Sequence, residues 1–296
     1  MKQKSWLPIY LALGLVWGCS FIFIKLGLEF LTPVGVAFGR CALGAMTLLI
    51  IAKVRGISLP TERRTWFILW IVSLLLNVFP GILFAFAEER VTTILAGIIN
   101  ACTPLSTLIF ILFVFRSEKI SRHQIFGLII GGIGVLTVLG IWKGIGTNSA
   151  VGAIALLVAV TCYGLSFPII KKYLMPLNLK AEALAASQVT AATVTLLPFY
   201  LIDGIAKAEY RTGPILAMIA LGVFGSGLAY IWTFQIVERA GSSVASSVTY
   251  LTPVVAVFVG WLFLGEHISW HEPVGGAIVL LGAATSQGRF NKKRTA

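Results

Sequence analysis

Residues 89–104 read ERVTTILAGIINACTP, and residues 238–253 read ERAGSSVASSVTYLTP. Both stretches begin with Glu-Arg and end with Thr-Pro, and they lie 149 positions apart in a chain of 296 residues. Self-similarity at a fixed offset is the signature of a repeated structural unit. The two stretches therefore predict that the chain contains two copies of one unit, each about half of its length.

Two further sets of matches keep nearly the same offset. The segment WGCSFIFIK at 17–25 resembles YGLSFPIIK at 163–171, with five of nine positions identical. Glycines and polar residues near the end of each half also correspond: Glu118, Ile120, Ser121, His123, Gly127 and Gly134 match Glu266, Ile268, Ser269, His271, Gly275 and Gly282. The offset stays between 146 and 149. We therefore expect a first repeat at 1–146 and a second at 147–296.

The composition is that of a membrane protein. Hydrophobic residues make up 58% of the chain and charged residues 11%, and the mean hydropathy is +0.94. A soluble domain carries about 25% charged residues. The net charge of +12 is distributed in short clusters between apolar runs, a pattern that argues against nucleic-acid binding.

Apolar stretches of about 20 residues can cross a bilayer as helices. The sequence predicts ten, five in each repeat: 7–26, 33–53, 66–87, 92–115, 123–142, 150–171, 180–202, 213–237, 241–264 and 270–288. The charge-free run from Ser5 to Ile24 is longer than the core of a signal peptide, so we interpret it as a retained helix. Because five is odd, the second copy enters the membrane from the opposite side. The expected fold is an all-α integral membrane protein with ten transmembrane helices in two inverted five-helix repeats.

The placement of Lys and Arg predicts the orientation. With the N-terminus in the cytoplasm, 17 of the 23 basic residues fall in inside segments, five fall outside and Arg40 lies within a span. Cytoplasmic loops carry such an excess. We therefore expect a multi-pass protein of the inner, or plasma, membrane with both termini cytoplasmic.

Arg40 is the only charge deep within a predicted span. Counted from Pro33 it lies about 10 Å inside the membrane, where a charge costs about 2.5–3.5 kcal/mol on insertion scales. One interpretation is a clamp for an anion or carboxylate, or a gate. The other is a side chain that reaches the interface or caps carbonyls of a neighbouring helix.

Pro104 and Pro253 interrupt the fourth and ninth predicted helices at matched positions. A proline inside a helix frees the carbonyl four residues earlier, here that of Asn100 and of Thr249. We predict kinks, with a gating role as the functional interpretation and simple packing as the alternative. A freed acceptor inside a membrane needs water, a neighbouring helix or a substrate as its partner.

Aromatic and hydrogen-bonding residues inside the spans suggest a small-molecule pocket. Each of them could instead serve helix–helix packing. The candidate substrate-binding residues are Trp17, Ser20, Arg40, Asn77, Asn100, Tyr163, Tyr230 and Tyr250.

Several features are absent from the sequence. No Asp or Glu lies in the middle of a predicted span, which argues against coupling through a buried carboxylate. No P-loop motif is present, so ATP hydrolysis is not expected. Each of the four cysteines lies in an apolar stretch without a CxxC pair, so we expect neither metal nor disulfide, and no cofactor or catalytic residue.

On these residues the chain resembles the EamA family of the drug/metabolite transporter superfamily. The resemblance rests on WGCSF at 17–21, Arg40, the two repeated stretches and GEHISWHEPVGGAIVLLG at 265–282; the first copy departs from it with SEKIS at 117–121. It implies two five-helix bundles and export of amino acids or related metabolites. It also implies a cavity between helices 1, 3, 4 and 6, 8, 9, which points to Trp17, Asn77, Asn100, Tyr163, Tyr230 and Tyr250.

Two alternatives remain open at the level of sequence. A membrane-embedded enzyme acting on lipid would need His267 and His271 beside Glu266 and Glu272. A lipid scramblase, channel or non-catalytic subunit would need no such cluster. The expected partners are a small-molecule substrate and membrane lipid, with a homodimer as an option.

Overall fold

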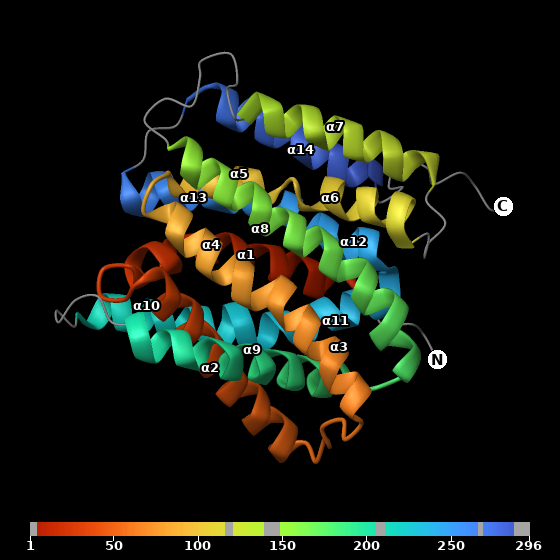
Figure 1. Ribbon diagram of the computed structural model, residues 1–296. Coiled ribbons are helices and arrows are strands. Elements are labelled where there is room, and N and C mark those ends of the chain that lie inside the picture. Colours follow the sequence, from red (N-terminus) through yellow and green to blue (C-terminus); the bar gives the residue numbers. More distant parts are fainter. Residues whose placement is uncertain (1–4, 116–120, 139–148, 205–210, 266–268, 287–296) are drawn as a thin grey trace.

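The computed structural model describes residues 5–115, 121–138, 149–204, 211–265 and 269–286. These residues form helices and contain no strand of a sheet. Eight helical segments are long and apolar enough to cross a membrane (Figure 1): Leu7–Gly27, Pro33–Val54, Arg63–Glu88, Thr93–Phe115, Ala150–Leu177, Ala181–Asp203, Thr212–Ala240 and Ser242–Leu264.

Three of these segments are uninterrupted helices: α1 (Leu7–Gly27), α2 (Pro33–Val54) and α9 (Ala181–Asp203). The others are interrupted. The third span consists of α3 (Arg63–Ser73), a π-helical turn at Leu74–Val78 and α4 (Phe79–Glu88), and the fourth of α5 (Thr93–Asn100), α6 (Thr103–Phe110) and a π-helical turn at Ile111–Phe115. The span Ala150–Leu177 begins with α8 (Ala150–Ile169), which has a π-helical end at Ile170–Leu174. The span Thr212–Ala240 consists of α10 (Thr212–Ala220), a π-helical stretch at Leu221–Leu228 and α11 (Ala229–Ala240), and the span Ser242–Leu264 of α12 (Ser242–Ser246), a 3-10 turn at Ser247–Tyr250 and α13 (Thr252–Leu264).

The two remaining predicted spans, 123–142 and 270–288, coincide with α7 (Arg122–Val138) and α14 (His271–Ser286). Over the described residues these helices have 17 and 16 residues, which is short for a crossing. The residues that follow each helix lie outside the described part of the chain. The eight longer spans are therefore confirmed as helices, and the number ten stays a prediction.

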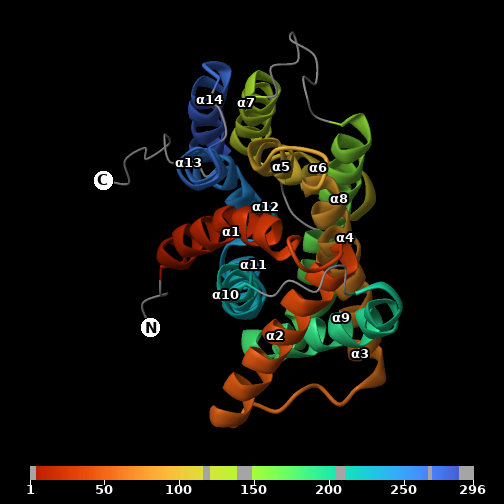
Figure 2. The same ribbon diagram turned by 90° about the vertical axis from the view of Figure 1, so that its left-hand side faces the viewer.

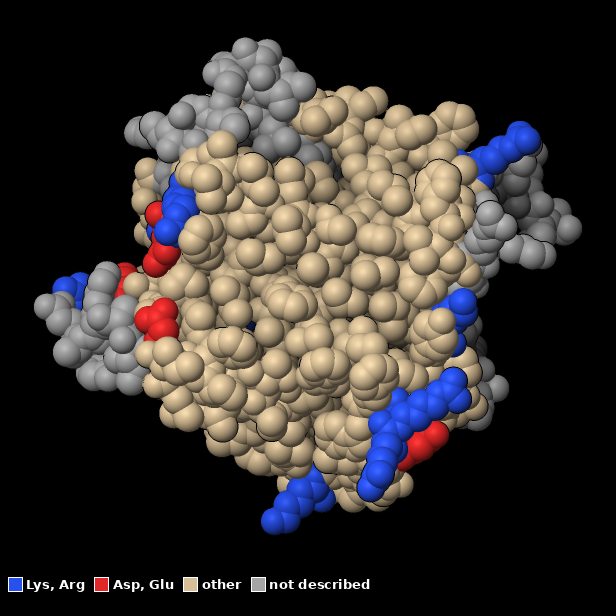
Figure 3. Space-filling view, in the orientation of Figure 1, with Lys and Arg blue, Asp and Glu red and all other residues tan. Residues whose placement is uncertain are grey.

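The surface is that of a protein surrounded by lipid. Large apolar side chains are exposed along the helices, including Val54 at 81%, Phe113 at 76% and Ile202 at 85%. Figure 3 shows Lys, Arg, Asp and Glu at the two ends of the bundle and an uncharged belt between them. An apolar surface of this extent is not stable in water, so the chain is a multi-pass membrane protein.

The two halves of the chain interleave, so the two expected five-helix units pack against each other as one bundle. Helix α1 packs against α13, α2 against α9, α4 and α6 against α8, and α7 against α14. The end-on view in Figure 2 shows the α7–α14 pair at one edge and α2 with α9 at the opposite edge. Every one of these contacts joins the first half to the second, so any cavity at the centre is shared by both.

Glycines allow the closest of these approaches. A Cβ atom on Gly18 would lie 2.4 Å from Cβ of Val255, and one on Gly14 would lie 2.5 Å from Cδ1 of Leu251. The Gly14/Gly18 pair on α1 therefore receives the first turn of α13. This is the packing use that such spacing has in membrane helices.

Candidate functional site

The fourth span is broken beside the centre of the bundle. Helix α5 ends at Asn100, and α6 begins at Thr103 with Pro104 in its first turn. Proline has no N–H to donate, and the hydroxyl of Thr103 takes its place by donating to the Asn100 carbonyl at 2.7 Å. The break at Pro104 is therefore a built helix restart whose backbone is satisfied locally.

The ninth span repeats the same arrangement. A 3-10 turn ends at Tyr250, α13 begins at Thr252, and Pro253 lies in its first turn. The Thr252 hydroxyl donates to the Thr249 carbonyl at 2.8 Å. Both carbonyls that the sequence analysis left open are therefore capped within the chain and do not need a substrate as their partner.

A side-chain bond joins the two breaks. The Asn100 amide donates from Nδ2 to Oγ1 of Thr252 at 3.2 Å. The other amide atom, Oδ1, is buried and has no hydrogen-bond partner among the described residues. Asn100 thus ties the halves together with one end of its amide and offers an unused acceptor with the other.

A central cavity with an empty volume of about 510 Å³ lies beside these breaks. Both halves of the chain contribute to its walls. The lining residues are Trp17, Ser20, Phe21, Ile24, Arg40, Leu76, Phe84, Asn100, Thr103, Tyr163, Phe167, Tyr230 and Thr249.

Arg40 is the only charged residue among those that line the cavity. Its side chain is held by one bond, from Nε to Oγ of Ser226 at 3.0 Å, and it is 7% exposed. In the described part of the chain it has no carboxylate within ion-pair distance. The fixed Nε leaves the two terminal nitrogens as donors for a ligand, and a carboxylate matches their fork geometry.

Aromatic rings form much of the remaining wall. The Trp17 and Tyr230 rings meet edge to face at 6.4 Å between centroids, and the Phe84 and Tyr163 rings stack at 5.7 Å. Trp17 donates from Nε1 to the Gly225 carbonyl at 3.3 Å, and the Tyr230 hydroxyl donates to the Leu76 carbonyl at 2.9 Å. Both acceptors belong to π-helical stretches, so the irregular backbone fixes the rings that face the cavity.

The structure brings six of the eight candidate residues to this cavity: Trp17, Ser20, Arg40, Asn100, Tyr163 and Tyr230. Asn77 and Tyr250 do not line it. Asn77 accepts a bond from Nε2 of Gln188 at 2.6 Å, and the fully buried Tyr250 directs its hydroxyl toward Gly131 on α7. Pro104 and Pro253 start their helices and do not contact the cavity.

Sequence reasoning missed several wall residues, among them Phe21, Phe84 and Phe167. A signal was present for two of them, since Phe21 and Phe167 match across the repeat. Phe84 gave no signal, because it is one phenylalanine in a uniformly apolar segment. Its place in the wall depends on which face of α4 turns inward.

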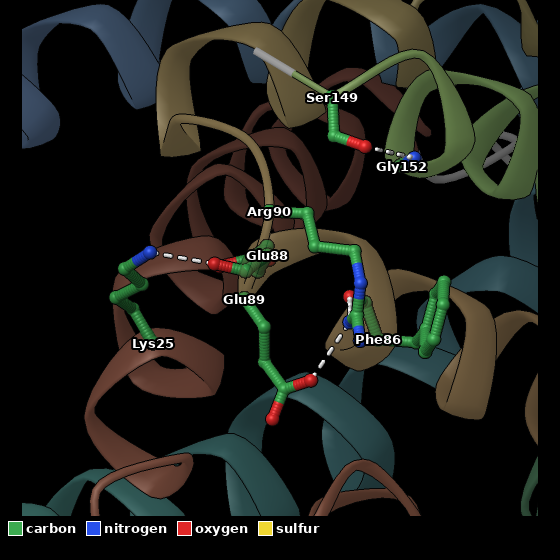
Figure 4. A network of polar contacts seen from close by, with 7 residues as sticks. All are labelled: Lys25, Phe86, Glu88, Glu89, Arg90, Ser149 and Gly152. Carbon is green, nitrogen blue, oxygen red and sulfur yellow. Dashed lines mark hydrogen bonds and ion pairs between the residues drawn. The ribbon is translucent and has the colours of Figure 1, made fainter. Parts of the chain in front are cut away.

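A buried carboxylate lies at the predicted outer end. Glu88, the last residue of α4, is 0% exposed, although it directly follows the predicted span 66–87 in the sequence. Figure 4 shows Nζ of Lys25 donating to the Glu88 carbonyl, at 2.5 Å, beside Arg90, which donates to the Phe86 carbonyl and pairs with Glu89 at 2.8 Å. This polar network joins the ends of α1 and α4.

A metal centre finds no support in the described residues, which contain no group of three or more His, Cys, Asp or Glu that could hold one. The cluster considered for a lipid enzyme falls largely elsewhere. Glu266, His267 and the side chain of Glu272 lie outside the described residues.

Comparison with known families gives a match over both halves. The EamA-like transporter family matches residues 4–140 and again residues 150–286. The chain is thus covered twice by one family, as expected for a duplicated unit.

Individual relatives align over nearly the full length. The uncharacterized inner membrane transporter YedA of Escherichia coli K12 is 27% identical over 98% of this chain and 94% of its own. The uncharacterized transporter YoaV of Bacillus subtilis is 22% identical over 96% and 97%, and protein PecM of Dickeya dadantii is 24% identical over 88% and 84%. A solved structure titled only "Crystal structure of protein" shares the fold, with a TM-score of 0.76 and 16% identity over 98% of this chain and 100% of its own.

Proposed function

The chain belongs to the EamA-like transporter family, and from that premise we propose that it exports small metabolites, amino acids first among them, by alternating access. Transport is secondary and runs through the cavity between two inverted repeats. Both termini face the cytoplasm, and the chain works alone or as a homodimer. In many transporters built from such repeats the substrate site lies at the repeat interface near the midplane.

The observation that carries this proposal is Arg40 in the cavity wall. A buried cation with no acidic partner within ion-pair distance in the described chain is costly, and a substrate carboxylate relieves that cost. The unused Oδ1 of Asn100 supplies an acceptor for an amino group. The rings of Trp17 and Tyr163 favour apolar or aromatic side chains.

The alternative functions are a lipid scramblase, a channel and a non-transporting subunit. A carrier exchanges substrate across the membrane with saturation and competition, whereas a channel conducts without them. The two helix breaks at matched positions beside a cavity shared by both halves favour the carrier, since transporters built from inverted repeats place their substrate site at such an interface.

The test is exchange of labelled amino acids in proteoliposomes, comparing wild type with Asn100→Ala and Ser73→Ala. These are two buried polar residues of which only Asn100 lines the cavity. We expect saturable exchange that falls severalfold in Asn100→Ala, in keeping with loss of one buried bond of about 1 kcal/mol. Ser73→Ala, which loses one side-chain bond to the Trp70 carbonyl, is the matched control for lost stability.

Saturable exchange that both variants reduce equally would remove the cavity as the substrate site. No exchange of any amino acid by folded protein would overturn the proposed substrate class. Flux that does not saturate would favour the channel.

A further inference from the structure

Helices α2 and α9 lie antiparallel and side by side (Figure 1). At one end, the Thr32 amide before α2 donates to the Gly204 carbonyl after α9 at 3.3 Å. At the other end, Arg55 after α2 pairs with Glu182 at the start of α9 at 2.9 Å. The two helices therefore begin at opposite ends of the bundle.

Arg40 and Gln188 hold equivalent places on these helices. Arg40 comes seven residues after Pro33, the first residue of α2, and Gln188 comes seven residues after Ala181, the first residue of α9. At 1.5 Å per residue, each lies about 10 Å from the start of its helix. The two side chains are thus at mirror depths, measured from opposite ends.

Their hydrogen bonds are equivalent as well. Arg40 donates to Ser226 in the π-helical stretch Leu221–Leu228, at 3.0 Å. Gln188 donates to Asn77 in the π-helical turn Leu74–Val78, at 2.6 Å. Arg40 to Gln188 is an offset of 148 and Asn77 to Ser226 one of 149, as elsewhere in the repeat. One interaction therefore occurs twice, once in each orientation.

The two copies differ in their surroundings. Arg40 lines the cavity, whereas Gln188 is 0% and Asn77 3% exposed. Oε1 of Gln188 has no hydrogen-bond partner among the described residues, and Nδ2 of Asn77 meets only the thiol of Cys41, a weak acceptor. Two amides sealed from water with unused polar atoms are unusual in a native interior.

We propose that Gln188 lines the cavity in the opposite-facing conformation, in the place that Arg40 holds in this one. The inference rests on alternating access as proposed above. When inverted repeats exchange conformations, equivalent residues exchange environments. The unused amide oxygen of Gln188 then meets water or substrate, and its burial belongs to the present conformation alone.

The exchange also makes the two conformations chemically unequal. In the present conformation a cation faces the cavity, and in the other a neutral amide takes the equivalent place. An anionic group is bound more tightly here than there, so the change of conformation itself weakens the hold on the substrate.

The test uses single cysteines at equivalent positions, Arg40→Cys and Gln188→Cys, in protein whose four native cysteines are replaced by alanine. Reconstituted protein is treated with a membrane-impermeant thiol reagent from one side or the other, without any substrate, because a carrier samples both conformations when empty. Val189→Cys, also 0% exposed and next in sequence, is the matched control. Ser166→Cys is a second reporter should Gln188→Cys fail to fold, because Ser166 is 0% exposed and its repeat equivalent Ser20 lines the cavity.

We expect Gln188→Cys and Ser166→Cys to react at least about tenfold faster than Val189→Cys, since a state populated at a few per cent exposes them. We also expect them to react from the membrane face opposite to that of Arg40→Cys. Reaction of Gln188→Cys no faster than Val189→Cys, or from the same face as Arg40→Cys, would overturn the inference.

Adding a mixture of the common amino acids separates the two proposals. Protection of Ser20→Cys, which reports the present cavity, by that mixture supports the substrate class. Its absence, with opposite-face labelling intact, would reject amino acids as substrates and leave the exchange of positions standing.

Discussion

The two proline breaks are alike in their backbone and differ in the polar side chain that precedes the break beside the cavity. In both, a threonine hydroxyl caps the carbonyl that the proline leaves open, Thr103 in the first half and Thr252 in the second. At the matched position before the break, the first half has Asn100 with a free acceptor. The second half has Thr249, whose hydroxyl is spent on the Ser246 carbonyl at 2.9 Å.

This difference distinguishes the residues that restart the helices, which both halves share, from the polar side chain beside the cavity, which differs between the halves. A helix restart is needed in each half, so duplication has kept threonine and proline in both. Asn100 and Thr249 both line the cavity, and of the two only Asn100 keeps an acceptor without a partner among the described residues. The positive charge of Arg40 is likewise confined to the first half, because its equivalent in the second half is the neutral Gln188.

The largest effect is expected where the halves differ most in charge. Arg40→Gln gives the first half the residue of the second and removes two charge-assisted donors, so we expect kcat/KM for exchange to fall about a hundredfold. Arg40→Lys keeps the charge without the fork and should retain part of the activity. Full activity in Arg40→Gln would show that the charge has a structural role.

The second largest effect is expected at the two threonines whose hydroxyls cap the freed carbonyls. Thr252 both donates to Thr249 and accepts from Asn100, whereas Thr103 caps a single carbonyl. Thr252→Val leaves two buried groups unpaired, at about 1–3 kcal/mol each, and Thr103→Val leaves one. Thermal unfolding in detergent should show a larger fall in Tm for Thr252→Val. Equal falls would mean that the bond between the breaks contributes nothing.

A smaller effect follows from making the first break resemble the second. Asn100→Thr removes the free amide oxygen together with the bond from the amide to Thr252, and it leaves no buried amide unpaired. The Tm should therefore fall less than in Thr252→Val, which leaves two buried groups unpaired. We expect severalfold weaker exchange of amino acids, with most of the change in KM. Thr249→Val, at the matched position, is the control that should change KM less.

The smallest effect is expected at the lysines that end α1 and α8. Lys25 donates to the Glu88 carbonyl at 2.5 Å, and its repeat equivalent Lys171 donates to the Val237 carbonyl at 3.5 Å. Lys25→Gln should cost about 1 kcal/mol of stability, and Lys171→Gln about half of that. The measurement is again the Tm of the purified variants, and the reverse order would show that the shorter contact of Lys25 with the Glu88 carbonyl is not the stronger one.

Much of the candidate site could be predicted from single residues. Arg40, Asn100 and Tyr163 were found because a polar or amphipathic residue in an apolar span is rare and conspicuous. Asn77 was found by the same reasoning and does not line the cavity. Phe84 and Leu76 do line it and carry no such mark, since apolar residues on every side of a membrane helix do not indicate which face turns inward.

The sequence by itself determined that this is a helical membrane protein with a duplicated unit, because hydropathy and repeated motifs are properties of the chain order alone. It also determined two of the helix breaks, at Pro104 and Pro253, since a proline acts on its own backbone. The π-helical stretches at Leu74–Val78 and Leu221–Leu228 contain no proline and could not be predicted in this way. Only the tertiary structure decided that the halves interleave, that Glu88 is buried and which residues form the cavity. The physical reason is that these depend on the rotation and depth of each helix against its neighbours, and those are set by packing between segments more than a hundred residues apart.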